Sequence, residues 1–106
     1  TTQTGGAVPS AGQGRLSNFP NPFNPSTTII LELPGEAGEI HPTEIDIYDT
    51  AGRAVCRLFS GGAPSGRSEF LWDGTSDSGS AVCSGFYMAV SRTRQLRLER
   101  KLVLLR

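Results

Sequence analysis

The sequence predicts an all-β fold, an immunoglobulin-like β-sandwich of about seven antiparallel strands. Thirteen glycines and seven prolines in 106 residues disfavour helix. Short runs of alternating apolar and polar residues have the period of half-buried strands, and turn residues separate them at intervals of about 8–12 residues. No segment sustains the apolar stripe of an amphipathic helix. The length suits one small domain.

The chain changes composition after its first residues. Residues 1–15 are mainly Gly, Ser, Thr, Gln and Ala, so we expect a flexible linker that buries almost nothing. The folded domain is expected over residues 16–106, and it begins with a short strand near residues 16–19. The chain starts without Met and closes on KLVLLR, which predicts a fragment of a longer protein with a natural C-terminus.

Six further strands follow from the alternation of apolar and polar residues. They are predicted at residues 27–34, 43–49, 53–60, 67–73, 86–92 and 96–106. Their main inward side chains are expected to be Ile29, Leu31, Leu33, Ile45, Ile47, Phe70 and Trp72. The segments between strands are rich in turn residues and are predicted to be loops at 35–42, 50–52, 61–66 and 74–85, with Gly52 available for a positive φ.

Two strands depart from simple alternation. In residues 53–60, Val55 and Leu58 are three positions apart, which predicts either a bulge or partial cover on both faces. In residues 96–106, the alternating leucines are interrupted once by Arg100.

The stretch NFPNPFNPSTTI (18–29) is stiff and apolar for a linker. Proline restricts φ and biases the preceding residue toward extended backbone, so the segment is ordered before it joins the next strand. We expect Phe19 and Phe23 to pin it against the sandwich and to close one end of the core.

The composition excludes several classes of function. Ten acidic and ten basic residues leave the chain neutral, so it has no whole-molecule attraction for nucleic acid or an anionic membrane. No apolar run approaches the ~20 residues that span a bilayer, and the first residues lack a signal-peptide pattern.

The chain offers little for catalysis or for metal binding. Its one histidine, His41, is predicted to be a solvated loop residue with no nucleophile or orienting acid near it in sequence. In DGTSDSG (73–79), the oxygens of Asp73, Ser76 and Asp77 are close together, but the bidentate Glu of a calcium loop is missing. A tight turn is favoured, and we expect no enzymatic activity, no cofactor and no metal site.

Cys56 and Cys83 are the only cysteines. A bond between them would close a loop of about 28 residues and stabilise the fold by about 3.5 kcal/mol. Two unpaired thiols are the alternative, and the sequence leaves both open.

Six stretches carry a resemblance to a known family. NFPNPFNPSTTI precedes LELP, and then come IYDTAGRAV, LWDG with a following Gly, SGFYMAV and the final RKLVLLR. In this order and spacing, residues 16–106 resemble the C-terminal sorting domain of the type IX secretion system and the related immunoglobulin-like domain of the flagellar hook-capping protein.

The resemblance implies a sandwich at the end of a large exported protein. There the domain is the address read by an outer-membrane translocon, and a sortase-like enzyme often removes it before the cargo is attached to surface lipopolysaccharide or released. It implies a secreted or cell-surface location, reached through the periplasm of a Gram-negative-type bacterium. The residues that match are Pro20, Asn21, Pro22, Phe23, Asn24, Pro25, Gly85, Tyr87, Lys101, Leu102, Val103, Leu104 and Leu105.

The sequence departs from the family pattern in three places. Ser76 stands where an Asp is usual, with Asp77 one place later, and Arg94–Gln95 make the last hairpin short and basic. The two cysteines are not family features.

The last hairpin carries a basic cluster made of Arg92, Arg94, Arg97, Arg100 and Lys101, which outnumber Glu99. Two interpretations are open: a stripe that contacts lipopolysaccharide phosphate or an acidic translocon subunit, or a solvated edge whose charges prevent pairing with other sheets. Because aromatic residues do not interleave with these charges, nucleic acid is not an expected partner.

Two other functions compete with sorting. The domain could be a structural or accessory module of a surface enzyme, acting as a spacer or binding glycan or a partner, with Tyr48 as the best outward aromatic. A hook-capping assembly role is disfavoured, because that domain is normally internal and lacks the terminal KLVLLR.

Overall fold

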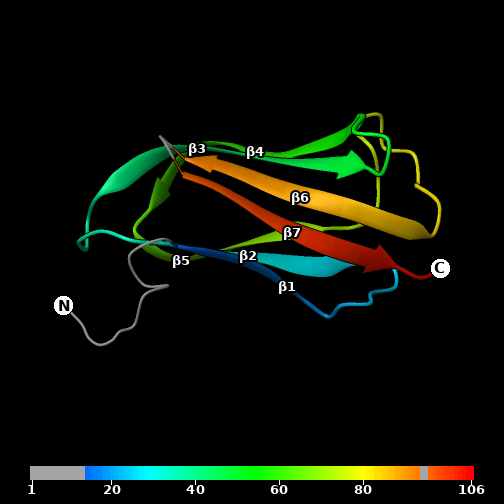
Figure 1. Ribbon diagram of the computed structural model, residues 1–106, viewed down its shortest axis with the longest axis horizontal. Coiled ribbons are helices and arrows are strands. Elements are labelled where there is room, and N and C mark those ends of the chain that lie inside the picture. Colours follow the sequence, from blue (N-terminus) through cyan, green and yellow to red (C-terminus); the bar gives the residue numbers. More distant parts are fainter. Residues whose placement is uncertain (1–13, 94–95) are drawn as a thin grey trace.

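The computed structural model describes residues 14–93 and 96–106, which form a β-sandwich of seven antiparallel strands (Figure 1). The three-stranded sheet has the order β1-β2-β5 and the four-stranded sheet the order β4-β3-β6-β7. The strands are β1 (Arg15–Phe19), β2 (Thr27–Leu33), β3 (Ile40–Asp49), β4 (Ala54–Pro64), β5 (Gly66–Trp72), β6 (Gly85–Thr93) and β7 (Leu96–Leu104). The predicted all-β, immunoglobulin-like sandwich is confirmed. Within the described residues, no helix has the length and apolar character needed to cross a membrane.

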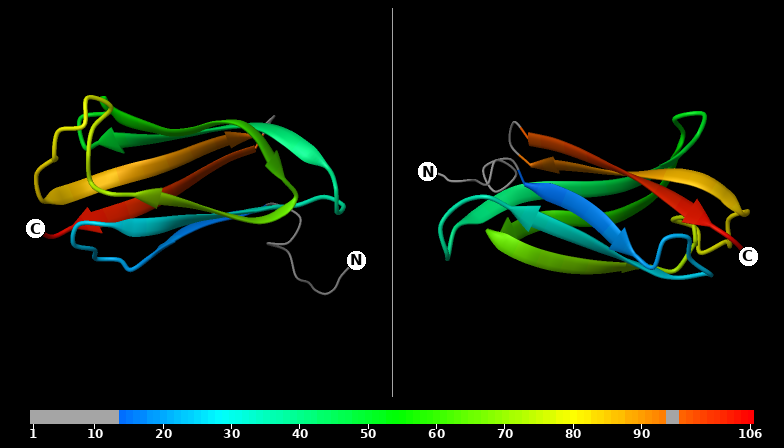
Figure 2. Two further views of the ribbon diagram at one scale, coloured as in Figure 1. Left: turned by 180° about the vertical axis from the view of Figure 1, so that it is seen from behind. Right: turned by 60° about the horizontal axis from the view of Figure 1, so that its bottom comes forward.

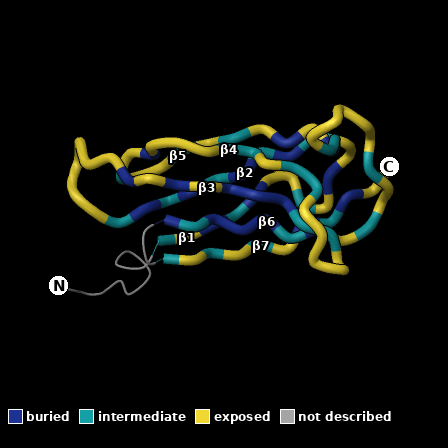
Figure 3. Tube along the Cα trace, turned by 90° about the horizontal axis from the view of Figure 1, so that it is seen from above, coloured by how far each residue is buried: buried dark blue, intermediate teal, exposed yellow. Residues whose placement is uncertain are grey.

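The core lies between the two sheets and follows the predicted alternation. Ile29 and Leu31 of β2 and Ile45 and Ile47 of β3 are fully buried. Trp72 of β5 is also buried. Figure 3 shows buried stretches along β2, β3 and β6, with exposed loops at both ends of the sandwich. These side chains supply the apolar burial that stabilises a domain of this size.

β4 contains the irregularity that the spacing of Val55 and Leu58 predicts. Its register against β3 shifts between Ile45 and Asp46 and again between Ile47 and Tyr48. Each shift leaves one residue of β4 without an opposite partner, so the bulge alternative is confirmed.

The structure corrects two predicted loops. β3 begins at Ile40, inside the segment predicted to be a loop over 35–42. β4 runs on to Pro64 and β5 begins at Gly66, so most of 61–66 is strand. Glycine and proline favour loops locally, but pairing with β3 supplies the backbone partners of Gly61 and Gly62 and overrides that preference. Figure 2 shows the chain passing here from one sheet to the other.

His41 is not the solvated loop residue that the sequence predicts. It lies in β3 with its side chain buried, and its Nε2 is 2.9 Å from Ser65 Oγ. The error follows from the position of β3, whose first residues pair with the glycine-rich half of β4.

The predicted linker differs slightly from the observed start of the domain. β1 begins at Arg15, inside the range given to the linker, because Arg15 pairs with Glu32 of β2. Residues 1–13, which make up the rest of that prediction, lie outside the described residues.

The sandwich has two ends that differ in their loops. One end holds the β1–β2 connection (20–26), the β3–β4 turn, the long β5–β6 loop (73–84) and the last residues of the chain (Figure 1). We call it the Phe23 end. The opposite end holds the β2–β3 loop and the β4–β5 corner, and we call it the His41 end.

Candidate functional site: the proline-rich segment on the last strand

Residues 20–25, the proline-rich segment, place one aromatic ring in the core. The Phe23 side chain is 2% exposed, and its ring centroid lies 5.6 Å from that of Trp72. The Trp72 ring contacts Tyr87 edge-on at 5.5 Å, and its Nε1 donates to the Thr75 carbonyl at 2.9 Å. The three rings close the Phe23 end, as the sequence predicts for Phe23.

Phe19 does not pin the segment, and that prediction is wrong. Its side chain is 75% exposed. Because Phe19 pairs with Thr28 on β2, the strand alternation turns its side chain to the outer face and turns Asn18 inward.

The backbone of Phe23 is bonded to the last strand of the domain. Phe23 N–H donates to the Val103 carbonyl at 2.9 Å, and Leu105 N–H donates to the Phe23 carbonyl at 2.9 Å. The two chains run parallel at this bridge. The segment therefore behaves as a very short extra strand beside β7.

The Asn21 side chain extends this pairing. Its Oδ1 accepts from Val103 N–H at 2.9 Å, and its Nδ2 donates to the Lys101 carbonyl at 3.3 Å. A carboxamide with one donor and one acceptor presents the same groups as a peptide unit. Asn21 and Phe23 together cover the outer edge of β7 from Lys101 to Leu105, where an open edge would invite pairing with another chain.

A chain of hydrogen-bonded polar side chains lies beneath the proline-rich segment. Arg100 Nε donates to Asn18 Oδ1 at 2.8 Å, and Asn18 Nδ2 donates to Thr27 Oγ1 at 3.1 Å. The Thr27 hydroxyl donates in turn to the Pro20 carbonyl at 2.8 Å. Arg100 thus bridges β7 and β1, which explains its interruption of the leucine alternation. Sequence reasoning noted that interruption and missed its role.

The structure brings the predicted residues together at the Phe23 end, although Asn21 and Lys101 are 80 positions apart. Leu102 and Leu104 are fully buried, Val103 is half-buried, and Lys101 and Leu105 are exposed. The other exposed members are Pro20, Pro22, Asn24 and Pro25. The predicted set thus divides into buried residues that hold the surface and exposed residues that form it.

Gly85 and Tyr87 support the same end from β6. Gly85 has a φ of 151°, which favours glycine. The Tyr87 hydroxyl donates to the Cys83 carbonyl at 2.6 Å. Burial raises the pKa of the Tyr87 phenol, which keeps this donor protonated.

Arg106 ties the end of the chain to the β5–β6 loop. Its Nε donates to the Val82 carbonyl at 2.6 Å, and its Nη2 donates to the Gly74 carbonyl at 2.7 Å. Gly74 has a φ of 78°, and a Cβ added there would lie 2.8 Å from Nη2 and 3.0 Å from the Pro25 carbonyl oxygen, so a larger residue would strain the backbone and disturb this contact. Sequence reasoning found no signal for this contact.

The acidic residues of DGTSDSG (73–79) are bonded within the fold. Asp73 Oδ1 accepts from Thr75 Oγ1 at 2.6 Å, and Asp77 Oδ1 accepts from Arg57 N–H at 2.9 Å. Ser76, where the resemblance leads us to expect Asp, bonds through its Oγ to Ser78. Across residues 14–93 and 96–106, no three His, Cys, Asp or Glu side chains are grouped so as to hold a metal ion.

Cys56 and Cys83 are free thiols, so the disulfide alternative is not the one that the structure adopts. Cys56 is half-buried on β4 against the core, whereas Cys83 is exposed in the loop before β6. Burial, followed by the charges of Asp77 and Asp73, raises the pKa of the Cys56 thiol.

Two members of the basic cluster, Arg92 and Arg97, are paired with acidic residues. Arg92 Nη1 donates to Asp46 Oδ2 at 3.2 Å and Arg92 Nη2 to the Tyr48 hydroxyl at 3.0 Å. Arg97 pairs with Glu99 at 2.9 Å. Arg94 and Gln95 lie outside the described residues.

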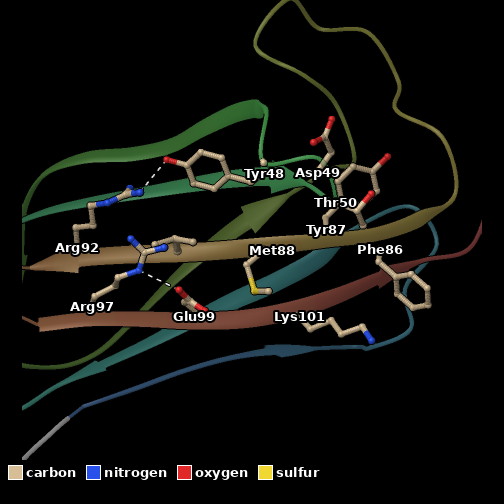
Figure 4. Close-up of a pocket in the computed structure, with 12 residues that line it drawn as sticks. Tyr48, Asp49, Thr50, Phe86, Tyr87, Met88, Arg92, Arg97, Glu99 and Lys101 are labelled. Carbon is tan, nitrogen blue, oxygen red and sulfur yellow. Dashed lines mark hydrogen bonds and ion pairs between the residues drawn. The ribbon is translucent and has the colours of Figure 1, made fainter.

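An open groove of about 610 Å³ lies on the outer face of β3, β6 and β7, and Arg92, Arg97 and Glu99 are among the residues that line it (Figure 4). Tyr48, the expected outward aromatic, is half-buried, and the Arg92 guanidinium lies 5.6 Å from its ring centroid. Phe86, which sequence reasoning did not single out, is 52% exposed, with Lys101 Nζ 4.3 Å from its ring centroid.

Comparison with known proteins identifies the family. The sequence profile of the FlgD Ig-like domain matches residues 23–94, more than half of the chain. The chain belongs to the FlgD Ig-like domain family. The sequence resembles two related domains, and this family is the one from the flagellar hook-capping protein. The predicted immunoglobulin-like domain is therefore confirmed. The sorting domain in particular stays a prediction.

Two solved structures from Porphyromonas gingivalis share the fold of this FlgD Ig-like domain. Dimeric latent PorU matches with a TM-score of 0.63 at 24% identity, over 87% of this chain and 9% of that chain. PorZ, an essential bacterial surface component of the type IX secretion system, matches with a TM-score of 0.55 at 24% identity, over 86% of this chain and 11% of that chain. This likeness shows the fold, and the chain spans only a small part of either protein. A comparison with curated proteins gave no significant match.

Proposed function

We propose that this FlgD Ig-like domain is a non-enzymatic sorting and anchoring module. It directs an exported multidomain protein through the type IX secretion system to the cell surface or the exterior. The contact between the proline-rich segment and β7 carries the proposal, because the residues of the sorting-domain resemblance at the two ends of the sequence meet there. The fold of PorZ, a surface component of that system, supports it.

The address in this proposal is a folded surface. Phe23, Leu102 and Leu104 are buried and hold the segment on β7. Pro22, Asn24, Lys101 and Leu105 are exposed above them and are available to a partner. The expected partners are the outer-membrane translocon, a sortase-like processing enzyme and surface lipopolysaccharide.

A reporter fused to the N-terminal side of residues 1–106 tests the proposal in a host that has this export machinery. We expect the reporter outside the cell or on its surface, and in the periplasm when residues 85–106 are deleted. A Pro22→Ala/Asn24→Ala variant should lower export about tenfold with little change in melting temperature, because both side chains are exposed.

The matched control is Arg67→Ala/Glu69→Ala, an exposed pair on β5 of the other sheet, which should leave export unchanged. A reporter that remains in the periplasm with the intact domain, or export that survives deletion of residues 85–106, would refute a sorting role.

A structural or accessory role is the second candidate. The chain covers only 9% of PorU and 11% of PorZ, a share typical of one domain among several, and this favours the second candidate. A reporter that is retained while the domain is folded would support it. The glycan-binding form of this candidate needs a free aromatic face, and the ring of Tyr48 already has Arg92 beside it.

A further inference from the structure

The groove on the outer face of the four-stranded sheet has a regular lining. Each residue of β6 in the groove has a paired residue on β7: Arg92 pairs with Arg97, Val90 with Glu99 and Met88 with Lys101. On the other side of β6, Tyr48 of β3 pairs with Met88, so Tyr48, Met88 and Lys101 form one row across the sheet. Phe86 lies in the next row toward the Phe23 end. Figure 4 shows Met88 in the middle of the groove, Arg92 and Arg97 toward one end, and Phe86 and Lys101 toward the other.

The floor of the groove is apolar. Val90 is buried although it faces outward, and Met88 is half-buried beside it. A thioether side chain is flexible and adapts to the shape of another side chain. The floor therefore suits the apolar side chains of a partner.

Basic side chains lie at both ends of the groove. Lys101 has no carboxylate partner among the described residues, and its Nζ lies over the Phe86 ring. Arg97 shares its charge with Glu99 in an exposed pair, while Arg92 is held by Asp46. Asp49, which also lines the groove, is paired with Arg53. Lys101 at one end and Arg97 at the other are thus the groups best placed to receive carboxylates.

We infer that this groove binds an extended peptide segment of a protein partner, with apolar residues over Met88 and Val90 and a carboxylate at each end. Arg92 lies six residue steps after Phe86 along β6, a distance of about 20 Å at about 3.3 Å per step. Seven residues in extended conformation cover that distance and turn every second side chain toward the floor. The inference does not depend on the sorting role: the groove shares Lys101 with the proposed sorting surface, but Met88, Val90 and Arg97 belong to the groove alone.

A sugar fits this groove less well. Carbohydrate recognition by aromatic residues needs a free ring face, whereas the two outward rings here, Tyr48 and Phe86, each have a cation at 5.6 Å and 4.3 Å from the centroid. A peptide carboxylate can bind Lys101 while its ammonium stays over Phe86.

The probe is the labelled peptide Glu-Thr-Val-Thr-Leu-Thr-Glu, titrated with the purified chain by fluorescence anisotropy. We expect saturable binding that weakens with salt, as screened charge pairs do, and no binding of the same peptide with lysine at both ends. Lys101→Ala should weaken binding at least fivefold, and Lys101→Arg should retain it. Arg97→Gln should weaken binding about threefold.

Arg67→Gln is the matched control. The Arg67–Glu69 and Arg97–Glu99 pairs have the same N–O distance of 2.9 Å, and each arginine side chain is 57% exposed. Arg67 lies on β5 of the three-stranded sheet, away from the groove. This variant should bind the peptide normally.

Three results would overturn the inference. They are equal binding of the lysine-ended peptide, unchanged binding by Lys101→Ala, and saturable binding of an anionic polysaccharide such as purified lipopolysaccharide core with none of the acidic peptide.

Discussion

The two ends of the sandwich are closed by different chemistry. At the Phe23 end, three aromatic rings pack together, and a segment from the start of the domain is bonded to its last strand. At the His41 end, short polar side chains close the core: His41 Nε2 lies 2.9 Å from Ser65 Oγ, and Thr43 Oγ1 lies 3.0 Å from Thr93 Oγ1.

The aromatic packing and the proposed recognition surface therefore lie at the same end of the sandwich. A buried aromatic ring contributes several kcal/mol, whereas a net hydrogen bond contributes about 1 kcal/mol. We therefore expect the Phe23 end to carry more of the folding free energy. Because its exposed residues rest on that packing, a change in the packing also changes the proposed recognition surface.

The largest effect is expected for Phe23→Ala. The change removes a ring that contacts Trp72 and leaves a cavity, so the free energy of unfolding should fall by about 3–5 kcal/mol in denaturant titration. Phe19→Ala is the control, because Phe19 is exposed, and it should change stability by less than about 0.5 kcal/mol. Equal effects of the two changes would remove the distinction between an anchor and a surface residue.

A smaller effect is expected for Asn21→Ala. The carboxamide bonds to Val103 and Lys101 would be lost at a partly exposed site, so the loss should be about 1–2 kcal/mol. Exposing the β7 edge should also raise self-association, which sedimentation velocity at increasing concentration would detect. A variant that stays monomeric with full stability would show that Asn21 does not protect this edge.

Thr43→Val tests the other end. It removes the bonds of the Thr43 hydroxyl to the Thr93 hydroxyl and to the His41 carbonyl and leaves the Thr93 hydroxyl buried. We therefore expect the free energy of unfolding to fall by about 1–2 kcal/mol, less than for Phe23→Ala. Thermal unfolding of both variants in one buffer makes the comparison. A larger loss for Thr43→Val than for Phe23→Ala would invert the assignment of stability.

The smallest effect concerns alkaline pH. The pKa of Tyr87 is raised in the folded state, mainly by burial, so the unfolded chain ionises first. The protonated phenol contributes fully to the free energy of unfolding below the ordinary tyrosine pKa of about 10. This contribution is lost as the pH rises through the higher pKa that Tyr87 has in the folded protein. Tyr87→Phe should therefore lose less stability than the parent between about pH 9 and 11. The measurement is the free energy of unfolding of both proteins at a series of pH values. The same dependence on pH for the two proteins would contradict this prediction.

The local patterns predicted the strands and their inner faces well, because apolar alternation is a direct consequence of strand geometry. They also gave the bulge in β4 as one of two alternatives and predicted the burial of Phe23. The errors lie where a distant strand decides the outcome. Gly61 and Gly62 are strand residues because β3 pairs with them, and His41 is buried for the same reason.

The candidate site was predictable in its parts and not in its assembly. The resemblance pointed to both the proline-rich segment and the last strand, but their contact joins residues about 80 positions apart and has no local pattern. The inward turn of Asn18 and Arg100 and the clamp of Arg106 on Gly74 depend on sheet register in the same way. Phe19 was misplaced because its apolar character was weighed above its position in the strand.

Amide hydrogen exchange, followed by NMR, tests the central claim most directly, namely that the proline-rich segment is paired with β7. We predict that the amides of Phe23, Val103 and Leu105 are protected, and that Asn21→Ala removes protection at Val103 while Leu105 keeps it. Exchange of all three amides at the rate of an unstructured peptide in the parent protein would contradict the pairing and the composite surface built on it.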